Sequence, residues 1–340
     1  MNQKKLRIGI IGLGRISITH LSAIIDSEYA QIVAVCDIIE ELAISTAKKY
    51  SCNYYVDYKE MINSENFDAV HVLLPHHLHV PVSIYAMEHG VDVLCEKPIS
   101  VNYETALQAV ECSERLNRNF GIIFQSRYNN SARFIKSKLE SGKLGKIISV
   151  TSVLTWNRTE DYYKIGDWRG TWDKEGGGVI INQTIHSIDL VNYLVNSPYK
   201  SVKATMANRI HPSIEVEDTA EGLIEYENGV KYLFYATNNY GDNTPIEIRL
   251  TCENGNVLFN YDDALIEYKD GTKEEAHQLN FNDYVENAMN YWGVQHKNQI
   301  NQFYRSVLGL EKLEVTGREA LKTQKLIEEI YKSGRKNFTY

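Results

Sequence analysis

Three features that would mark a secreted, membrane-spanning or zinc-thiolate protein are missing from this sequence. Its five cysteines are scattered and form no C-x-x-C pair, which argues against a disulfide framework and favours a reducing compartment. No apolar run approaches the roughly 20 residues that a membrane-spanning helix requires. The first residues lead directly into a strand pattern without a signal-peptide cleavage site. We therefore expect a cytoplasmic protein.

An excess of basic residues is also missing. The 36 lysine and arginine residues face 44 aspartate and glutamate residues, and the formal net charge is −8. Nucleic-acid binding requires a basic surface that neutralises phosphates, so we expect no nucleic-acid partner, and we expect no membrane partner either. Hydrophobic residues (43%) and charged residues (24%) are in a globular balance, and 340 residues favour two domains.

Residues 1–122 have the pattern of a doubly wound α/β domain. Continuous apolar runs are separated by amphipathic stretches such as 79–89 and 103–117, which is typical of a parallel sheet covered by helices on both faces. The five predicted strands are 6–12, 31–37, 68–74, 91–96 and 120–125.

Residues 123–340 have a different pattern and are predicted to form an α+β domain. Strand-like segments alternate in polarity and are separated by Asn228-Gly229, Asn254-Gly255 and Asp270-Gly271, dipeptides that favour hairpin turns. This pattern predicts a large, mostly antiparallel open sheet. Helices are predicted at 182–195, 283–308 and 317–333.

A glycine motif, GIIGLGRIS, follows the first predicted strand. Within a G-x-G-x-x-G fingerprint, Gly12 would form the tight turn and Gly14 would let a pyrophosphate approach the backbone, with Ser17 at the third position. The second predicted strand ends at Asp37, whose carboxylate would accept bonds from ribose hydroxyls and repel a 2′-phosphate. Neither of the next two residues is an arginine. We therefore predict NAD as the cofactor in preference to NADP, with a glycine turn in another doubly wound fold as the alternative.

Two further segments carry side chains suited to alcohol oxidation. Lys97 follows the predicted strand 91–96, at the sheet edge where open α/β sheets bind ligands. In GGGVIINQTIHSIDL (176–190), the spacing of Asn182, His186 and Asp189 places them on one helical face. Oxidation of an alcohol needs a base for the hydroxyl proton, and His186 is our candidate unless it is a core histidine. We expect Asp189 to orient His186 or to bind backbone amides.

Taken together, these motifs resemble the Gfo/Idh/MocA family of sugar and cyclitol oxidoreductases. The resemblance implies a Rossmann domain, a largely antiparallel open-sheet domain, and a substrate bound between them against the nicotinamide. The matching elements span nearly the whole chain in the expected order, and they are GIIGLGRIS, LPHHLH (74–79), E-K-P (96–98), GGGVIINQTIHSIDL and IYKS (330–333).

The resemblance implies a catalytic role for Lys97 and His186, with His186 as base and Lys97 bound to the same oxygen, or the reverse. Asn182 occupies a position where relatives often have aspartate, and its amide can bind a sugar hydroxyl or orient His186 but cannot accept a proton. The cofactor-binding residues implied by the resemblance are Gly12, Gly14, Arg15, Ile16, Asp37, Leu74, Pro75, His79, Glu96 and Lys97.

The segment WNRTEDYYKIGDWRGTW (156–172) combines aromatic rings with cationic side chains. Aromatic faces pack on the C–H faces of sugar rings, and arginines bind phosphate or carboxylate groups. Packing within a sheet or at a subunit contact is the alternative. The residues predicted to bind substrate are Asn182, Trp156, Trp168, Arg169, Arg127 and Tyr163.

The histidines His76, His77 and His79, with His71 nearby, raise the question of a metal site. Adjacent histidines on one turn rarely converge on one ion, and no cysteine or acidic partner accompanies them. We expect no metal site.

We therefore expect an NAD(H)-dependent oxidoreductase that transfers hydride between nicotinamide and a CH–OH group of a sugar, sugar derivative or cyclitol. Two alternatives stay open: a glycosidase that uses NAD in a closed redox cycle, and a non-catalytic dinucleotide- or sugar-sensing regulator. The aromatic strands of the second domain, together with the family resemblance, predict a homodimer or homotetramer formed through the C-terminal sheet.

Overall fold

The computed structural model describes residues 5–277 and 295–338, which form two compact units. The first unit contains residues 5–125 and 295–322, and the second contains residues 126–277 and 323–338. The sequence predicts one boundary near residue 122 with everything beyond it in the second domain. In the structure, residues 295–322 instead belong to the first unit.

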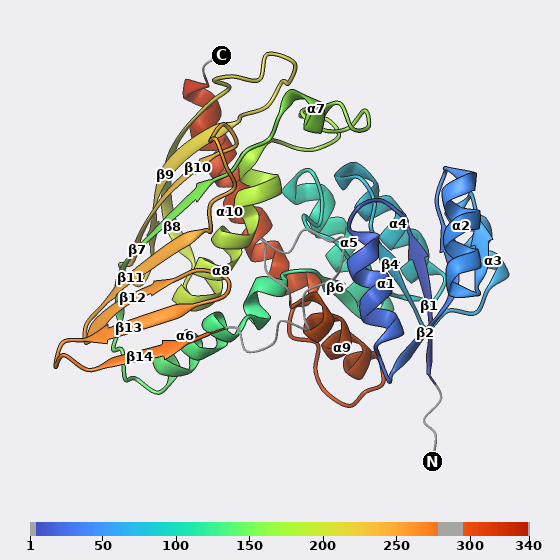
Figure 1. The fold of residues 1–340 in the computed structure, drawn as a ribbon, viewed down its shortest axis with the longest axis horizontal. Coiled ribbons are helices and arrows are strands. Elements are labelled where there is room, and N and C mark those ends of the chain that lie inside the picture. Colours follow the sequence, from blue (N-terminus) through green and yellow to red (C-terminus); the bar gives the residue numbers. More distant parts are fainter. Residues whose placement is uncertain (1–4, 278–294, 339–340) are drawn as a thin grey trace. The chain divides into compact units, whose positions relative to one another are not determined.

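The first unit is built on a six-stranded, fully parallel sheet in the order β3-β2-β1-β4-β5-β6 (Figure 1). The α/β expectation and the five predicted strands are confirmed, whereas β3 was missed because it is three residues long and largely exposed. The strands are β1 (Leu6–Ile11), β2 (Ala30–Cys36), β3 (Asn53–Tyr55), β4 (Ala69–Val72), β5 (Asp92–Cys95) and β6 (Phe120–Ile122).

Among the described residues, six α-helices lie wholly in this unit, and one of them comes from the C-terminal part of the chain. The side chains of Ile300, Phe303 and Tyr304 are fully buried in the core of the first unit, which explains why α9 returns to it. Part of the predicted helix 283–308 lies outside the described residues. The helices are α1 (Ser17–Ile25), α2 (Glu40–Tyr50), α3 (Tyr58–Ser64), α4 (His76–Glu88), α5 (Tyr103–Leu116) and α9 (His296–Val307).

The second unit is built on an eight-stranded sheet in the order β14-β13-β12-β11-β7-β10-β9-β8. Only the β7–β10 pair is parallel, so the predicted mostly antiparallel sheet is confirmed, as are hairpins at the three predicted turns. The strands are β7 (Ile147–Thr155), β8 (Tyr199–Ala207), β9 (Thr219–Tyr226), β10 (Lys231–Thr237), β11 (Glu247–Cys252), β12 (Gly255–Phe259), β13 (Ala264–Tyr268) and β14 (Lys273–Ala276).

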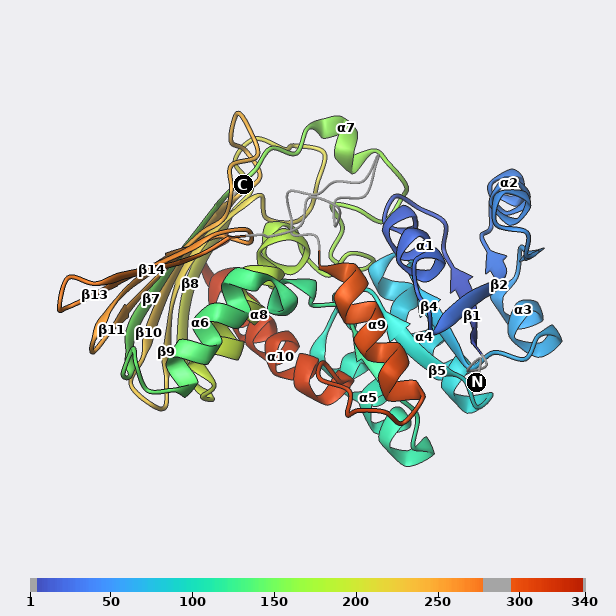
Figure 2. The same ribbon diagram turned by 60° about the horizontal axis from the view of Figure 1, so that its bottom comes forward.

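Helices α6 and α8 lie on one face of this sheet (Figure 2). Along the strands, buried residues alternate with residues that point to the opposite face. Several apolar residues on that face are exposed, among them Val153, Leu233, Tyr235 and Leu258. The remaining helical segments are η1 (Gln125–Tyr128), α6 (Asn130–Glu140), α7 (Glu160–Tyr163), the π-helical turn η2 (Ile180–Thr184), α8 (Ile185–Val195), α10 (Gly317–Gly334) and η5 (Arg335–Asn337).

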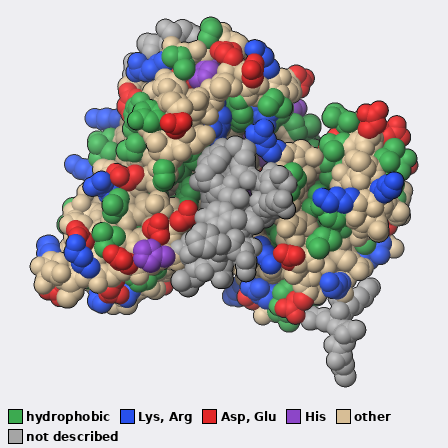
Figure 3. Space-filling view, in the orientation of Figure 1, with side chains coloured by type: hydrophobic (Ala, Val, Ile, Leu, Met, Phe, Trp, Pro, Cys, Tyr) green, Lys and Arg blue, Asp and Glu red, His purple; other side chains and the backbone are tan. Residues whose placement is uncertain are grey.

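Within the described ranges, no helix combines the length and the apolar character that a membrane crossing requires. On the face drawn in Figure 3, acidic and basic side chains are interspersed rather than separated into regions of one sign.

Candidate functional site

The predicted cofactor residues of the first unit follow the carboxyl ends of adjacent parallel strands. Gly12–Ile16 follows β1, Asp37 follows β2, Leu74–Pro75 follows β4, and Glu96–Lys97 follows β5. Because ligands of open α/β sheets bind at this edge, near the point where the strand order reverses, these residues share the expected dinucleotide position.

In the glycine turn after β1, the backbone requires glycine at Gly12 and leaves open space at Gly14. Gly12 has a φ of +96°, and a Cβ atom there would lie 2.4 Å from the carbonyl oxygen of Leu73. At Gly14 a Cβ atom would meet nothing within 4 Å, so the missing side chain leaves open space beside an exposed backbone. Ser17 is the first residue of α1, and its hydroxyl donates to the Gly14 carbonyl oxygen at 2.7 Å. The turn therefore fits a pyrophosphate placed at a helix N-terminus.

Two other predicted residues of the turn differ in exposure. Arg15 is exposed, whereas Ile16 is half-buried and packs against the core of the first unit. Asp37 is held beside the turn, because one carboxylate oxygen accepts the Leu13 N–H at 2.8 Å and the other accepts the Ile39 N–H at 2.9 Å. Its carboxylate thus has the fixed position at the end of β2 that ribose recognition requires.

His79, on α4, contacts two segments at the same edge of the parallel sheet. Its ring nitrogens lie 2.7 Å from the carbonyl oxygen of Leu74 and 2.6 Å from that of Pro98, so the imidazole bridges the segments that follow β4 and β5. Burial lowers the pKa of His79. Among the described residues, no group of three or more histidine, cysteine, aspartate or glutamate side chains is arranged to hold a metal ion.

Lys97 is half-buried, and Glu96 before it is buried. The backbone N–H of Lys97 donates to Glu96 Oε2 at 3.2 Å. Burial alone would raise the pKa of Glu96, but the hydrogen bond from His20 and the neighbouring charges lower it to about 2. Glu96 is therefore a carboxylate beside the predicted catalytic lysine.

In the second unit, His186 lies in the first turn of α8 and is 5% exposed. The half-buried Asn182 precedes it in η2, a π-helical turn of a kind that is frequent at functional sites. The Asn182 side-chain amide donates to Glu175 Oε1 at 2.6 Å and to the Tyr162 hydroxyl at 3.2 Å. A buried carboxylate therefore holds the amide that the sequence predicts to contact substrate.

The glycines before η2 are explained by close packing inside the second unit. A Cβ atom at Gly177 would lie 1.9 Å from the Tyr331 hydroxyl oxygen, and one at Gly178 would lie 1.9 Å from the Glu217 carbonyl oxygen. The Glu217 carboxylate accepts the N–H groups of Gly178 and Ile180 at 3.0 Å and the Tyr331 hydroxyl at 2.9 Å. The loop is thus fixed to the segment before β9 and to α10.

Burial is the largest cause that raises the pKa of both Glu175 and Glu217, in each case from 4.5 to about 7. A carboxyl group that binds its proton more tightly in the folded state adds stability at low pH and loses it as pH rises through the folded pKa. We therefore expect the contribution of these two groups to the free energy of unfolding to fall by about 1 kcal/mol or more between about pH 5 and pH 7.5.

Urea unfolding of Glu175→Gln at both pH values checks this expectation. The free energy of unfolding of the wild type minus that of the variant should be smaller at the higher pH, because the amide does not titrate. Glu227→Gln changes an exposed glutamate of the same unit and should behave like the wild type. An equal difference between wild type and Glu175→Gln at both pH values would show that the Glu175 carboxyl group does not titrate in this range.

The segment after β7 brings three predicted substrate residues into a ladder of cations and aromatic rings. The guanidinium carbon of Arg158 lies 5.1 Å from the ring centre of Trp156 and 5.2 Å from that of Tyr162. The guanidinium carbon of Arg169 lies 4.8 Å from the Tyr162 ring centre and 4.6 Å from that of Trp168. Through Tyr162 this ladder is connected to Asn182.

Two predicted substrate residues have partners inside the second unit. Arg127 is 4% exposed and makes a bidentate pair with Asp189, with nitrogen–oxygen distances of 2.7 and 2.6 Å. Asp189 also accepts the Thr323 hydroxyl at 2.9 Å, so its carboxylate binds these two side chains instead of the expected His186 or backbone amides. Tyr163 is 6% exposed and its hydroxyl accepts the Asn238 amide at 3.2 Å.

Three residues of these clusters were not predicted from sequence: Glu175, Glu217 and His20. Glu175 directly precedes the three glycines, and that position was the one available signal. Glu217 and His20 are remote in sequence from the groups they contact, so no local pattern indicated them.

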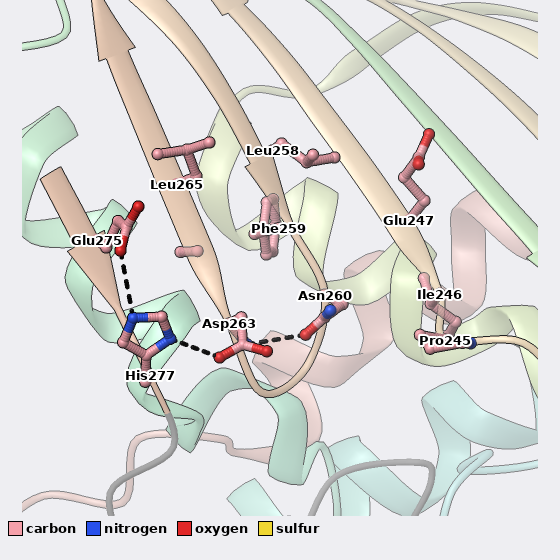
Figure 4. A pocket seen from close by; sticks show the side chains of 11 residues that line it. Pro245, Ile246, Glu247, Leu258, Phe259, Asn260, Asp263, Leu265, Glu275 and His277 are labelled. Carbon is pink, nitrogen blue, oxygen red and sulfur yellow. Dashed lines mark hydrogen bonds and ion pairs between the residues drawn. The ribbon is translucent and has the colours of Figure 1, made fainter. Parts of the chain in front are cut away.

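A cavity of about 420 Å³ lies at the ends of β11 to β13 in the second unit (Figure 4). Its polar side consists of His277, which contacts Asp263 at 2.8 Å and Glu275 at 3.4 Å. None of the residues that line it is a predicted catalytic, cofactor or substrate residue.

Comparison with family models gives two matches that follow one another along the chain. A model described as an oxidoreductase family with an NAD-binding Rossmann fold matches residues 6–124. A model described as the GFO/IDH/MocA C-terminal domain matches residues 132–258. The two matches fall on the two sheets described above.

Similar proteins include characterised dehydrogenases. The inositol 2-dehydrogenase of Salmonella typhimurium is 25% identical over 254 residues, which are 74% of this chain and 69% of that protein. The D-glucoside 3-dehydrogenase of Escherichia coli is 28% identical over 247 residues, which are 67% of this chain and 69% of that protein. The WlbA dehydrogenase of Bordetella pertussis, solved with NADH and UDP-GlcNAcA, has a TM-score of 0.86 and 26% identity, with 98% of this chain and 97% of that chain covered.

Proposed function

The chain belongs to the Gfo/Idh/MocA family of NAD-dependent oxidoreductases, and from this we propose that Lys97 and His186 catalyse its reaction. It is an NAD(H)-dependent dehydrogenase that acts on a CH–OH group of a sugar, sugar derivative or cyclitol. The observation that carries the assignment is the order of the two family models along one chain, with Lys97 after β5 and His186 at the start of α8.

Each side chain has one role in the proposed step. His186 accepts the proton of the substrate hydroxyl, and Lys97 donates a hydrogen bond to the same oxygen as negative charge develops on it. Bound NAD⁺ supplies the acceptor for the hydride that leaves the carbon. Asn182, held by Glu175 and Tyr162, contacts a further hydroxyl of the substrate.

The proposed function is tested by incubating the protein with NAD⁺ and a panel of inositols, aldoses, sugar phosphates and nucleotide sugars. We expect net formation of NADH with at least one of these alcohols. Tight NADH binding without net NADH formation would contradict the dehydrogenase and favour a closed-cycle glycosidase or a sensor.

Asp37 sets the cofactor preference. Its carboxylate repels a 2′-phosphate, so Asp37→Ser is expected to lower the ratio of kcat/KM for NAD⁺ over NADP⁺ by about 10- to 100-fold. Steady-state kinetics with both dinucleotides gives this ratio, which is insensitive to a loss of folded protein. The control Glu41→Ser removes an exposed carboxylate from α2 and should leave the ratio unchanged. An unchanged ratio in Asp37→Ser would remove this residue from ribose recognition.

Within the substrate class, we favour a sugar that carries a carboxylate or phosphate. Arg158 and Arg169 support this, because both guanidinium groups lie over the ring of Tyr162, whose hydroxyl accepts the Asn182 amide. Arginine recognises such anions through paired hydrogen bonds. The uronic acid derivative bound by the WlbA dehydrogenase is a ligand of this chemistry.

The quaternary state and compartment are part of the proposal. We propose a cytoplasmic homodimer or homotetramer that covers the exposed face of the second sheet. Val153, Leu233, Tyr235 and Leu258 support this, because they present apolar surface from β7, β10 and β12. The five cysteines, none in a C-x-x-C pair, support a reducing compartment.

A further inference from the structure

A row of buried, hydrogen-bonded side chains crosses the first unit and ends at Glu96. Tyr304 Oη lies 2.9 Å from His71 Nε2, and His71 Nδ1 lies 2.8 Å from His20 Nδ1. His20 Nε2 lies 3.1 Å from Glu96 Oε1, and His296 Nε2 lies 3.9 Å from the same oxygen. The row therefore connects α9, β4 and α1 with the end of β5.

All members of the row are at most 7% exposed, so it is a polar structure inside an apolar core. Burial of polar side chains costs free energy of folding unless their hydrogen bonds are satisfied. Burial lowers the pKa of His71 well below its ordinary value and that of His296 to about 4, and it raises the pKa of Tyr304. These three side chains are therefore neutral at physiological pH.

The distances define a consistent proton arrangement for the neutral histidines. Tyr304 donates to His71 Nε2, His71 donates through Nδ1–H to His20 Nδ1, and His20 donates through Nε2–H to Glu96. One additional proton converts His20 to an imidazolium, which donates to the Glu96 carboxylate and to His71 Nδ1. His71 then donates from Nε2 to the Tyr304 hydroxyl, so the His20–His71 and His71–Tyr304 bonds both reverse. His20 and Glu96 together are thus the place where that proton is held.

This pair lies on the half of the sheet that receives the second nucleotide of a dinucleotide. The strand order reverses between β1 and β4, and Asp37 marks the β1–β2 half as the side of the adenosine ribose. Glu96 follows β5 on the other half, where the nicotinamide is bound. NAD⁺ carries one more positive charge on that ring than NADH, so the two cofactor forms impose different potentials on His20 and Glu96.

We propose that His20 and Glu96 form a redox-linked proton site, which binds one proton when the cofactor is NADH and releases it when the cofactor is NAD⁺. The proposal rests on the cofactor assignment above. Oxidation of one CH–OH group gives one hydride and one proton: the hydride passes to NAD⁺, and the proton passes to His186, which releases it to solvent. The His20–Glu96 pair takes up one proton from solvent when NADH replaces NAD⁺, and it returns that proton to solvent when NADH is exchanged. The other titratable groups around the pair are Lys97 and Cys95 beside Glu96, His79 on α4, His71 on β4, and His296 and Tyr304 on α9.

The test compares the dissociation constants of NAD⁺ and NADH for the full-length protein between about pH 6 and pH 9. In the wild type, we expect the ratio Kd(NAD⁺)/Kd(NADH) to rise as pH falls, by up to about tenfold per pH unit, which is the limit for one proton. In His20→Gln the side-chain amide still donates to Glu96 but does not titrate, so the ratio should become nearly independent of pH. His89→Gln, an exposed histidine of the same unit, should retain the wild-type slope.

Calorimetry of the wild type in two buffers with different ionisation enthalpies provides a second measurement that needs no variant. NADH binding should take up more protons than NAD⁺ binding at the same pH. A pH-independent ratio in the wild type, or an equal slope in His20→Gln, would overturn the proposal while leaving the cofactor assignment intact. Failure to bind either dinucleotide would overturn the cofactor assignment itself.

Discussion

Replacing Lys97 or His186 by alanine is expected to lower kcat for NAD⁺ reduction by about 10²- to 10⁴-fold, which is the contribution of a positioned acid or base. The two side chains act on one oxygen in the proposed step, so the double variant should be only slightly slower than the worse single variant. Removal of His186 takes away the proton acceptor, and removal of Lys97 takes away the group that stabilises the developing negative charge.

Initial rates of NADH formation at saturating alcohol measure this effect. The Kd for NADH and the thermal midpoint identify variants that have lost binding or folding instead of chemistry. Lys48→Ala in α2 and His277→Ala after β14 change exposed residues of the same types and should keep wild-type rates. Full activity in either the Lys97 or the His186 variant would remove that residue from the catalytic step.

Replacing Arg127 by alanine is expected to destabilise the second unit by about 3–5 kcal/mol, the cost of leaving one partner of a buried ion pair alone. Asp189 would remain fully buried and would keep the hydrogen bond from the Thr323 hydroxyl. The Arg127 guanidinium provides two short bonds to this carboxylate, at 2.7 and 2.6 Å. The double variant Arg127→Met/Asp189→Leu should recover much of the loss, because it removes both charges.

Urea unfolding followed by tryptophan fluorescence measures this change. Trp156, Trp168 and Trp172 all belong to the second unit, so the signal follows mainly that unit. The sequence predicts a different role for Arg127, contact with substrate. A variant that unfolds like the wild type but has a raised KM for the sugar would favour that prediction over the structural role.

Much of the fold is predictable because it depends on local pattern. Continuous apolar runs identify β1, β2, β4, β5 and β6, and asparagine–glycine or aspartate–glycine pairs identify the hairpins of the second sheet. The glycine turn and Asp37 were predicted for the same reason, since spacing within one strand–turn–helix unit determines their positions. The π-helical turn at Ile180–Thr184 was not predicted, because its sequence has ordinary helical character.

The polar clusters around the candidate residues could not be predicted, because their partners are distant in sequence. Arg127 and Asp189 are 62 positions apart, and His20 and His71 are 51 positions apart. Each pair depends on how separate elements pack, and a single sequence contains no period or spacing that encodes such contacts. Asn182 and Glu175 are only seven positions apart, yet their contact requires the chain reversal at Gly176–Gly178.

Transfer of deuterium from substrate to cofactor tests the central claim most directly. An alcohol that is oxidised by the protein is prepared with deuterium on the carbinol carbon and incubated with NAD⁺, and the reduced cofactor is examined by mass spectrometry and NMR. We expect one deuterium on nicotinamide C4, on a single face of the ring, in an amount equal to the ketone formed. Unlabelled NADH, or loss of the deuterium to water without ketone accumulation, would contradict hydride transfer from a CH–OH group.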